Sequence, residues 1–208
     1  MAYITIAAPV RAEIVIKRSR FIASLAPVET EEAAREFVTA VKKEFHDARH
    51  NPSAWILSPA GDKQKSSDDG EPGGTAGQPI LSVLGKNGLT NVACVVTRYF
   101  GGIKLGAAGL VRAYGDTAVL AINEAQKLSV GEYSRLAVTC DYNLYGTLEN
   151  FFRKKELRIT DTAYAADVTA ELLIEPEAKE ALMGELTDLL NGRIAFEDRG
   201  TSQLAVPL

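Results

Sequence analysis

The chain has 208 residues and a net charge of −4, and 46% of its residues are hydrophobic. These ordinary globular values exclude a mainly disordered or fibrous chain, and the length allows one large domain or two small ones. The longest apolar runs are about five residues, whereas a membrane-spanning helix needs about 20, so we expect no membrane association.

Cysteine usage and the first residues of the chain point to a cytoplasmic location. Cys94 and Cys140 lie far apart in separate apolar runs, which is typical of two buried reduced thiols. The start of the chain lacks the basic and apolar segments of a secretory signal. Residues 1–133 are nearly neutral and residues 134–208 carry the acidic excess, so a nucleic-acid surface would have to be a local patch in the first part.

The first part alternates between strand and helix patterns. Residues 14–16 and 21–25 are predicted strands, and the basic residues 17–20 between them predict a hairpin with a cationic tip. Thr30 is a good N-cap for a helix that runs to about Phe45. Further along, we expect a strand (53–57), a long polar loop (58–78), a short helix (80–84), a buried strand (92–96) and a long helix (110–125).

The last part has a regular order of elements. A charge shift at 129–133 suggests a boundary between a domain of residues 1–130 and one of residues 134–208. After it we predict a strand (136–142), a helix (144–155), two strands (157–161 and 167–174), a helix (177–190) and a strand (193–197). This is the βαββαβ order of a ferredoxin-like domain.

One candidate site is the glycine-rich segment 67–77. Its backbone could cradle an anion where it enters a helix, and its acidic side chains could instead hold Mg²⁺. The alternative is a solvated loop whose acids cap local N–H groups. The candidate residues here are Asp68, Asp69, Gly70, Glu71, Gly74 and Thr75.

A second candidate site is the turn from the buried strand into the long helix. Free N–H groups at the start of that helix, with basic side chains nearby, could bind a phosphate. A tight corner that needs glycine for steric reasons explains the pattern equally well. The candidate residues are Arg98, Tyr99, Gly101, Gly102, Lys104, Gly106, Gly109 and Arg112.

The remaining candidates are basic or histidine residues. His46 and His50 have the i, i+4 spacing of a metal pair, but a histidine that hydrogen-bonds a neighbouring loop fits better. Lys17, Arg18 and Arg20 at the hairpin tip either contact phosphates or form a solvated end. We identify no nucleophile with a matching base, and so predict no catalytic residue, metal or cofactor.

Together these segments resemble the IMPACT/YigZ family. The resemblance rests on four ordered motifs: residues 17–22 (KRSRFI), 47–50 (DARH), 67–79 (SDDGEPGGTAGQP) and 98–114 (RYFGG, then LG and GLVRAY). It implies an α+β protein whose first domain is like the second domain of a small-subunit ribosomal protein, followed by a ferredoxin-like domain. Many relatives have two glycines where this chain has Ala108-Gly109, and a Cβ at position 108 would be costly at positive φ.

Two functions follow as hypotheses. The eukaryotic relative is a translational regulator, so the resemblance implies a non-enzymatic protein that binds RNA or a ribosome-associated protein. The alternative is a phosphate- or nucleotide-binding protein or enzyme that uses the two glycine-rich loops with Mg²⁺. Both hypotheses expect these two loops to lie on one surface of the first domain.

Overall fold

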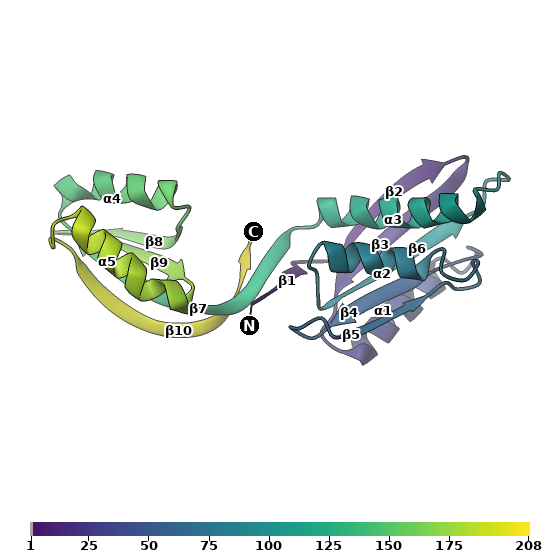
Figure 1. Ribbon diagram of the computed structural model, residues 1–208, viewed down its shortest axis with the longest axis horizontal. Helices are drawn as coiled ribbons and strands as arrows, with labels where there is room; N and C mark the ends of the chain where they lie inside the picture. The colour runs from purple at the N-terminus through teal and green to yellow at the C-terminus, as the bar shows by residue number, and fades with distance from the viewer. Residues whose placement is uncertain (1) are drawn as a thin grey trace. The chain divides into compact units, whose positions relative to one another are not determined.

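The computed structural model describes residues 2–208, and the chain forms two compact α+β units (Figure 1). Unit 1 comprises Met1–Val130 with Ala205–Leu208, and unit 2 comprises Gly131–Leu204. The α+β class expected from the sequence is confirmed. The last four residues group with unit 1, whereas the sequence pattern assigned them to the second domain; the Leu208 N–H donates to the Lys127 carbonyl of unit 1.

Unit 1 is built on an antiparallel five-stranded sheet in the order β2-β3-β6-β4-β5. The strand bounds are β2 (Val10–Ile16), β3 (Ser19–Pro27), β4 (Ser53–Leu57), β5 (Lys63–Ser67) and β6 (Val92–Tyr99). The register pairs Ile16 with Ser19, so the predicted hairpin closes through a two-residue turn, Lys17-Arg18. Both turn residues have positive φ, as a hairpin turn of this length requires.

Part of the predicted polar loop is a strand. β5 lies at the sheet edge and pairs with β4, but its side chains are almost all exposed. A polar edge strand carries no apolar alternation, and lysines protect such an edge from further pairing. The short strand β1 (Tyr3–Ile6), which pairs with Lys127–Val130, was also not expected.

Helices cover both faces of the sheet in unit 1 (Figure 1). On one face, α2 (Gly77–Lys86) and α3 (Gly106–Glu124) pack on inward residues such as Cys94. On the other, α1 (Glu31–Glu44) packs with Ala93 and Trp55. The predicted cap is confirmed, because the Thr30 hydroxyl accepts from the Ala33 N–H at 3.1 Å.

Unit 2 has the expected ferredoxin-like topology. Its strands lie in the order β10-β7-β9-β8, with α4 and α5 contributing to one core beside β7 and β9. The bounds are β7 (Lys127–Cys140), α4 (Tyr142–Lys154), β8 (Arg158–Tyr164), β9 (Val168–Ile174), α5 (Lys179–Leu189) and β10 (Ala195–Pro207), with a 3₁₀ turn η1 (Pro176–Ala178) before α5. β10 ends at Pro207, ten residues beyond its predicted end at 197. The prediction ended too early because most side chains of this strand are exposed and polar and give no apolar alternation.

Both cysteines are buried free thiols, as expected. Burial raises the pKa of the Cys94 thiol to about 12, so it stays protonated at neutral pH. Among the described residues, no helix combines the length and apolar character needed to cross a bilayer.

Candidate functional site

The two glycine-rich segments meet at one pocket beside the start of α3, which we call the α3 pocket. Its volume is about 370 Å³. Three parts of the chain line it: the loop before β4, the loop after β5, and the turn from β6 into α3. The lining residues are Arg49, His50, Glu71, Pro72, Arg98, Phe100, Lys104, Leu105, Gly106, Ala107 and Leu110.

The Asp68 carboxylate lies at the N-terminus of α2. Its carboxylate accepts from the N–H groups of Gly74, Ala76 and Gly77 at 2.8–3.0 Å. Burial would raise the pKa of this carboxyl, but the three N–H donors hold it below its usual value. The anion position predicted at this helix is therefore filled by a side chain of the protein itself, and Thr75 closes the same turn through its hydroxyl to Pro72 O.

Asp69 and Gly70 hold the loop before β4 in place. The Asp69 carboxylate accepts from Lys42 Nζ and from the Asn51 N–H, and its carbonyl accepts from His50 Nδ1 at 2.9 Å. Burial opposes ionisation of this carboxyl, but Lys42 and Asn51 lower its pKa. A Cβ on Gly70 would lie 3.3 Å from the His50 ring, and Gly70 has positive φ.

The three acids of the glycine-rich loop do not converge on one metal position in this structure. Each acid has a separate partner. Asp68 accepts from the Gly77 N–H at the start of α2, Asp69 pairs with Lys42, and Glu71 pairs with Arg98. Among residues 2–208, no group of three or more histidine, cysteine or acidic side chains is arranged to hold a metal. His50 binds the Asp69 carbonyl rather than sharing a helix face with His46, because α1 ends at Glu44.

Arg98 lines the α3 pocket with a side chain that is almost fully buried. Its side chain is only 8% exposed, and Nη1 donates to Glu71 Oε1 at 2.7 Å. The same oxygen accepts from the Tyr114 hydroxyl at 2.7 Å, and burial together with this bond raises the Tyr114 pKa. The guanidinium carbon lies 5.5 Å from the centroids of the Phe21 and Phe100 rings. Arg98 Nε is buried and has no hydrogen-bond partner.

The corner between β6 and α3 needs glycine where the chain passes close to the hairpin tip. A Cβ on Gly101 would lie 2.0 Å from the carbonyl carbon and oxygen of Arg18. Gly102 and Gly106 both have positive φ. Ala108 lies inside α3 at ordinary helical φ, so the alanine that departs from the family pattern is not strained.

The start of α3 has no capping side chain. Its N-cap is Leu105, which makes no side-chain cap hydrogen bond, and its first turn contains no acidic residue. A Cβ on Gly106 would meet nothing within 4 Å, whereas Gly109 lies against Leu105. The first N–H groups of this 19-residue helix thus receive no cap from the side chain of the N-cap residue.

The predicted basic residues divide into paired and unpaired groups. Arg20 forms a bidentate ion pair with Glu13 and lies over the Tyr99 ring, and the Tyr99 hydroxyl donates to Asp47. Within residues 2–208, by contrast, no hydrogen bond or ion pair engages the side chains of four exposed cations at this end of unit 1. We call these four the cationic end: Lys17, Arg18, Arg49 and Lys104. Arg112 is exposed further along α3.

Sequence reasoning missed the apolar half of the α3 pocket. Phe100, Leu105 and Leu110 line it, and Phe100 is 53% exposed. The sequence did contain a signal for this apolar surface, because Phe100 stands at the end of a buried strand and directly before two glycines. Arg49 was also missed as a lining residue, although it precedes His50 in a motif already singled out.

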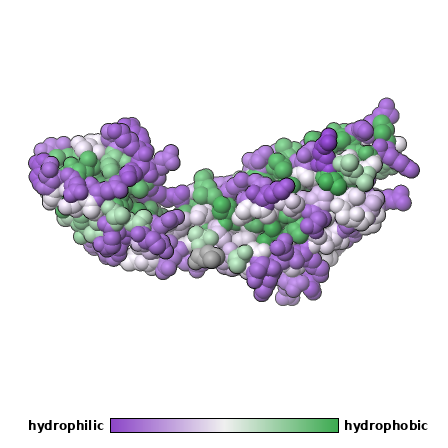
Figure 2. Space-filling model, viewed as in Figure 1, coloured by the Kyte–Doolittle hydropathy of each residue, from purple (hydrophilic) through white to green (hydrophobic). Residues whose placement is uncertain are grey.

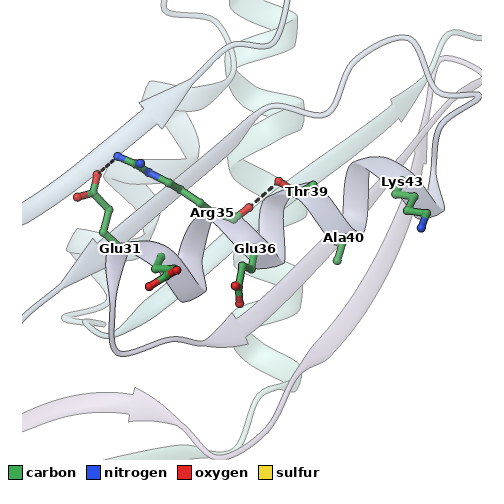
Figure 3. Close-up of a pocket in the computed structure, with 7 residues that line it drawn as sticks. Glu31, Arg35, Glu36, Thr39, Ala40 and Lys43 are labelled. Carbon is green, nitrogen blue, oxygen red and sulfur yellow. Dashed lines mark hydrogen bonds and ion pairs between the residues drawn. The ribbon is translucent and has the colours of Figure 1, made fainter.

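Another hollow lies along α1 and has different properties (Figure 3). The side chains there come from a single helix and interact with one another, including the Glu31–Arg35 ion pair and the Thr39 hydroxyl bond to Arg35 O. The residues that line this hollow all belong to α1, whereas three separate segments line the α3 pocket. We therefore interpret it as a solvated helix surface.

Comparison with known proteins matches both parts of the chain to described domain families. The family model described as the Impact N-terminal domain matches residues 17–122, and a domain of unknown function, DUF1949, matches residues 138–193. The chain is 40% identical to the IMPACT family member YvyE of Bacillus subtilis, covering 92% of this chain and 88% of that protein. It is 38% identical to the IMPACT family member YigZ of Escherichia coli, covering 90% and 93%. A crystal structure of a hypothetical protein is similar with a TM-score of 0.59 and 33% identity, over 94% of this chain and 96% of that one.

Proposed function

The chain belongs to the IMPACT family, and from that premise we propose that it is a non-enzymatic, translation-associated protein that binds RNA through the cationic end of unit 1. The family resemblance supplies the link to translation. The observation that carries RNA binding is the group of four exposed cations without ion-pair partners among residues 2–208. Phosphate contacts from such cations supply most of the affinity of sequence-independent binding.

The surroundings of the cationic end support a nucleic-acid partner. Val15, Phe100 and Ile103 are exposed there, and Figure 2 shows hydrophobic and hydrophilic residues interleaved at this end of unit 1. Aromatic and apolar side chains between cations are typical of surfaces that stack or cover single-stranded bases. The acidic excess of residues 134–208 makes unit 2 the less suitable surface.

The chemistry of the side chains favours binding over catalysis. The Cys94 thiol is buried and protonated, so it is a poor nucleophile. The acids of the glycine-rich loop are held by backbone N–H groups, Lys42 and Arg98. These groups stabilise the fold around the pocket and leave its basic rim available to a ligand.

The test measures the affinity for a single-stranded RNA by fluorescence anisotropy across a range of salt concentrations. The triple variant Lys17→Gln/Arg18→Gln/Lys104→Gln should bind more weakly, with a salt dependence of log K shallower by about 2, because each phosphate contact contributes about 0.7. The matched control, Lys63→Gln/Lys65→Gln/Lys86→Gln, removes three exposed lysines elsewhere in unit 1. Equal affinities and slopes for both variants would contradict the proposal.

A further inference from the structure

The α3 pocket contains a buried guanidinium with an unpartnered donor. Arg98 lines the pocket, and its Nη1 donates to Glu71 Oε1 at 2.7 Å. Its Nε is buried and has no hydrogen-bond partner among the described residues. Leaving donors of a charged group unsatisfied in the interior is costly, so an acceptor entering the pocket would stabilise this arrangement.

A second set of donors lies beside Arg98. The N-terminus of α3 opens at the pocket through Gly106 and Ala107 and has no side-chain cap. At the start of α2, by contrast, the N–H groups of Ala76 and Gly77 already donate to the Asp68 carboxylate. Helix N-termini favour anions through their free N–H groups and the helix dipole.

The charges that face the pocket favour a ligand with negative charge. Arg49, Lys104 and Arg98 are cationic, and His50 lines the pocket with its Nδ1 engaged by Asp69 O. Among the described residues that line the pocket, Glu71 is the one acid, and its Oε1 accepts from Arg98 and Tyr114. The lining therefore keeps an excess of positive charge.

The rest of the pocket is suited to a flat apolar group. Phe100, a residue that is 53% exposed, lines the pocket with Pro72, Leu105 and Leu110. The volume of about 370 Å³ is within the range of small-ligand sites. A nucleotide combines a phosphate with a base that can stack on an aromatic ring.

We propose that the α3 pocket binds a single nucleotide through its terminal phosphate. The phosphate oxygens accept from the N–H groups of Gly106 and Ala107 and from Arg98, and the base stacks on Phe100. The nucleotide is either a free mononucleotide or the phosphorylated end of an RNA strand. In the second case the inference deepens the proposed RNA binding and rests on it, and in the first it stands apart from it.

The decisive variant is Ala107→Asp, which places a carboxylate at the start of α3. An acidic residue in the first turn favours the helix, so this variant is expected to fold with an unchanged or higher melting temperature. The new carboxylate would occupy the proposed phosphate position at the start of α3, just as the Asp68 carboxylate accepts from the Gly77 N–H at the start of α2. The matched control is Ala108→Asp, an exposed neighbour in the same turn that does not line the pocket.

Calorimetry with AMP and with adenosine measures how much the phosphate contributes to the affinity of a free nucleotide. Calorimetry with 5′-phosphorylated and 5′-hydroxyl oligoribonucleotides measures the same contribution at the end of an RNA strand. We expect AMP or the 5′-phosphorylated strand to bind at least about tenfold more tightly than its unphosphorylated counterpart, the value of one lost charge-assisted hydrogen bond. Ala107→Asp should abolish that preference and Ala108→Asp should retain it. Preference for AMP identifies a free nucleotide, and preference for the strand alone identifies an RNA end.

Two results would overturn the inference. One is the absence of any phosphate preference in either pair of ligands, and the other is a preference that Ala107→Asp leaves intact. If both oligoribonucleotides still bind equally and lose affinity in the Lys17→Gln/Arg18→Gln/Lys104→Gln variant, the cationic end binds RNA and only the pocket proposal fails. If the unmodified protein binds AMP but binds neither oligoribonucleotide, the proposed RNA-binding function is rejected and the pocket proposal stands.

Discussion

At the scale of single residues, ionic side chains in the glycine-rich loops divide between stabilising the fold and facing solvent. Asp68, Asp69 and Glu71 each bind a donor within the protein, whereas Lys17 and Arg18 have no ion-pair partner among the described residues and adopt positive φ. Positive φ costs a residue with a Cβ about 1–2 kcal/mol. Two unpaired cations at positive φ reduce the stability of the hairpin, and a role in binding would explain why they stand there.

Replacing the tip with Lys17→Asn/Arg18→Gly tests that trade-off. Asn-Gly is the preferred pair for a two-residue hairpin turn, so the free energy of unfolding should rise by about 1 kcal/mol. RNA affinity should fall because both cations are lost. Urea denaturation and RNA titration measure the two effects, and a variant that is both more stable and equally tight in RNA binding would show that the tip has no binding role.

The Asp68 carboxylate makes a pH-dependent contribution to stability. Its pKa in the folded protein lies below the ordinary value of 3.8, so this contribution is complete above that value and is lost as the pH falls through the lowered pKa. Asp68→Asn should destabilise the partly exposed site by about 1 kcal/mol at pH 7. The difference in melting temperature from the unmodified protein should shrink below pH 4, and a difference that is constant with pH would refute this role.

At the scale of elements, the sequence predicts the parts that have an apolar face or a local signal. The Thr30 cap, the hairpin turn and the βαββαβ order of unit 2 could be predicted because each depends on neighbouring residues or on periodic apolar positions. The edge strand β5 and most of β10 could not, since exposed polar strands have no such pattern.

The candidate site was predictable to a similar extent. The glycine-rich motifs marked the two loops, and the structure brings both to the α3 pocket. The pairing of Arg98 with Glu71 could not be read from the chain, because it joins residues 27 positions apart through a tertiary contact. The alternative that acids of the glycine-rich loop cap local N–H groups is confirmed for Asp68, whose carboxylate accepts from Gly74, Ala76 and Gly77. The sequence did not show which of the loop's acids would do so.

The contact between the hairpin tip and the β6–α3 corner should be sensitive to one added methyl group. Gly101→Ala would place a Cβ 2.0 Å from the Arg18 backbone, so the two elements must separate, and overpacking of this kind costs about 1–3 kcal/mol. Gly73→Ala is the control, since a Cβ there meets nothing within 4 Å. Thermal denaturation of both variants checks the expectation, which equal melting temperatures would contradict.

At the scale of the whole molecule, the features that point to a ligand are concentrated in unit 1. It holds the cationic end, the α3 pocket and the four family motifs. In unit 2, Arg135 and Arg199 both pair with Glu171, and Arg199 also pairs with Glu197, so these two cations already have acidic partners. We therefore expect that any RNA recognition takes place on unit 1.

The most direct test is photo-crosslinking of the full chain to RNA that contains 4-thiouridine, with the crosslinked peptides identified by mass spectrometry. The account predicts crosslinks within residues 15–20 and 98–107, with fewer in the Lys17→Gln/Arg18→Gln/Lys104→Gln variant. Crosslinks confined to residues 131–204, or no crosslinked RNA at all, would contradict the assignment of RNA binding to the cationic end.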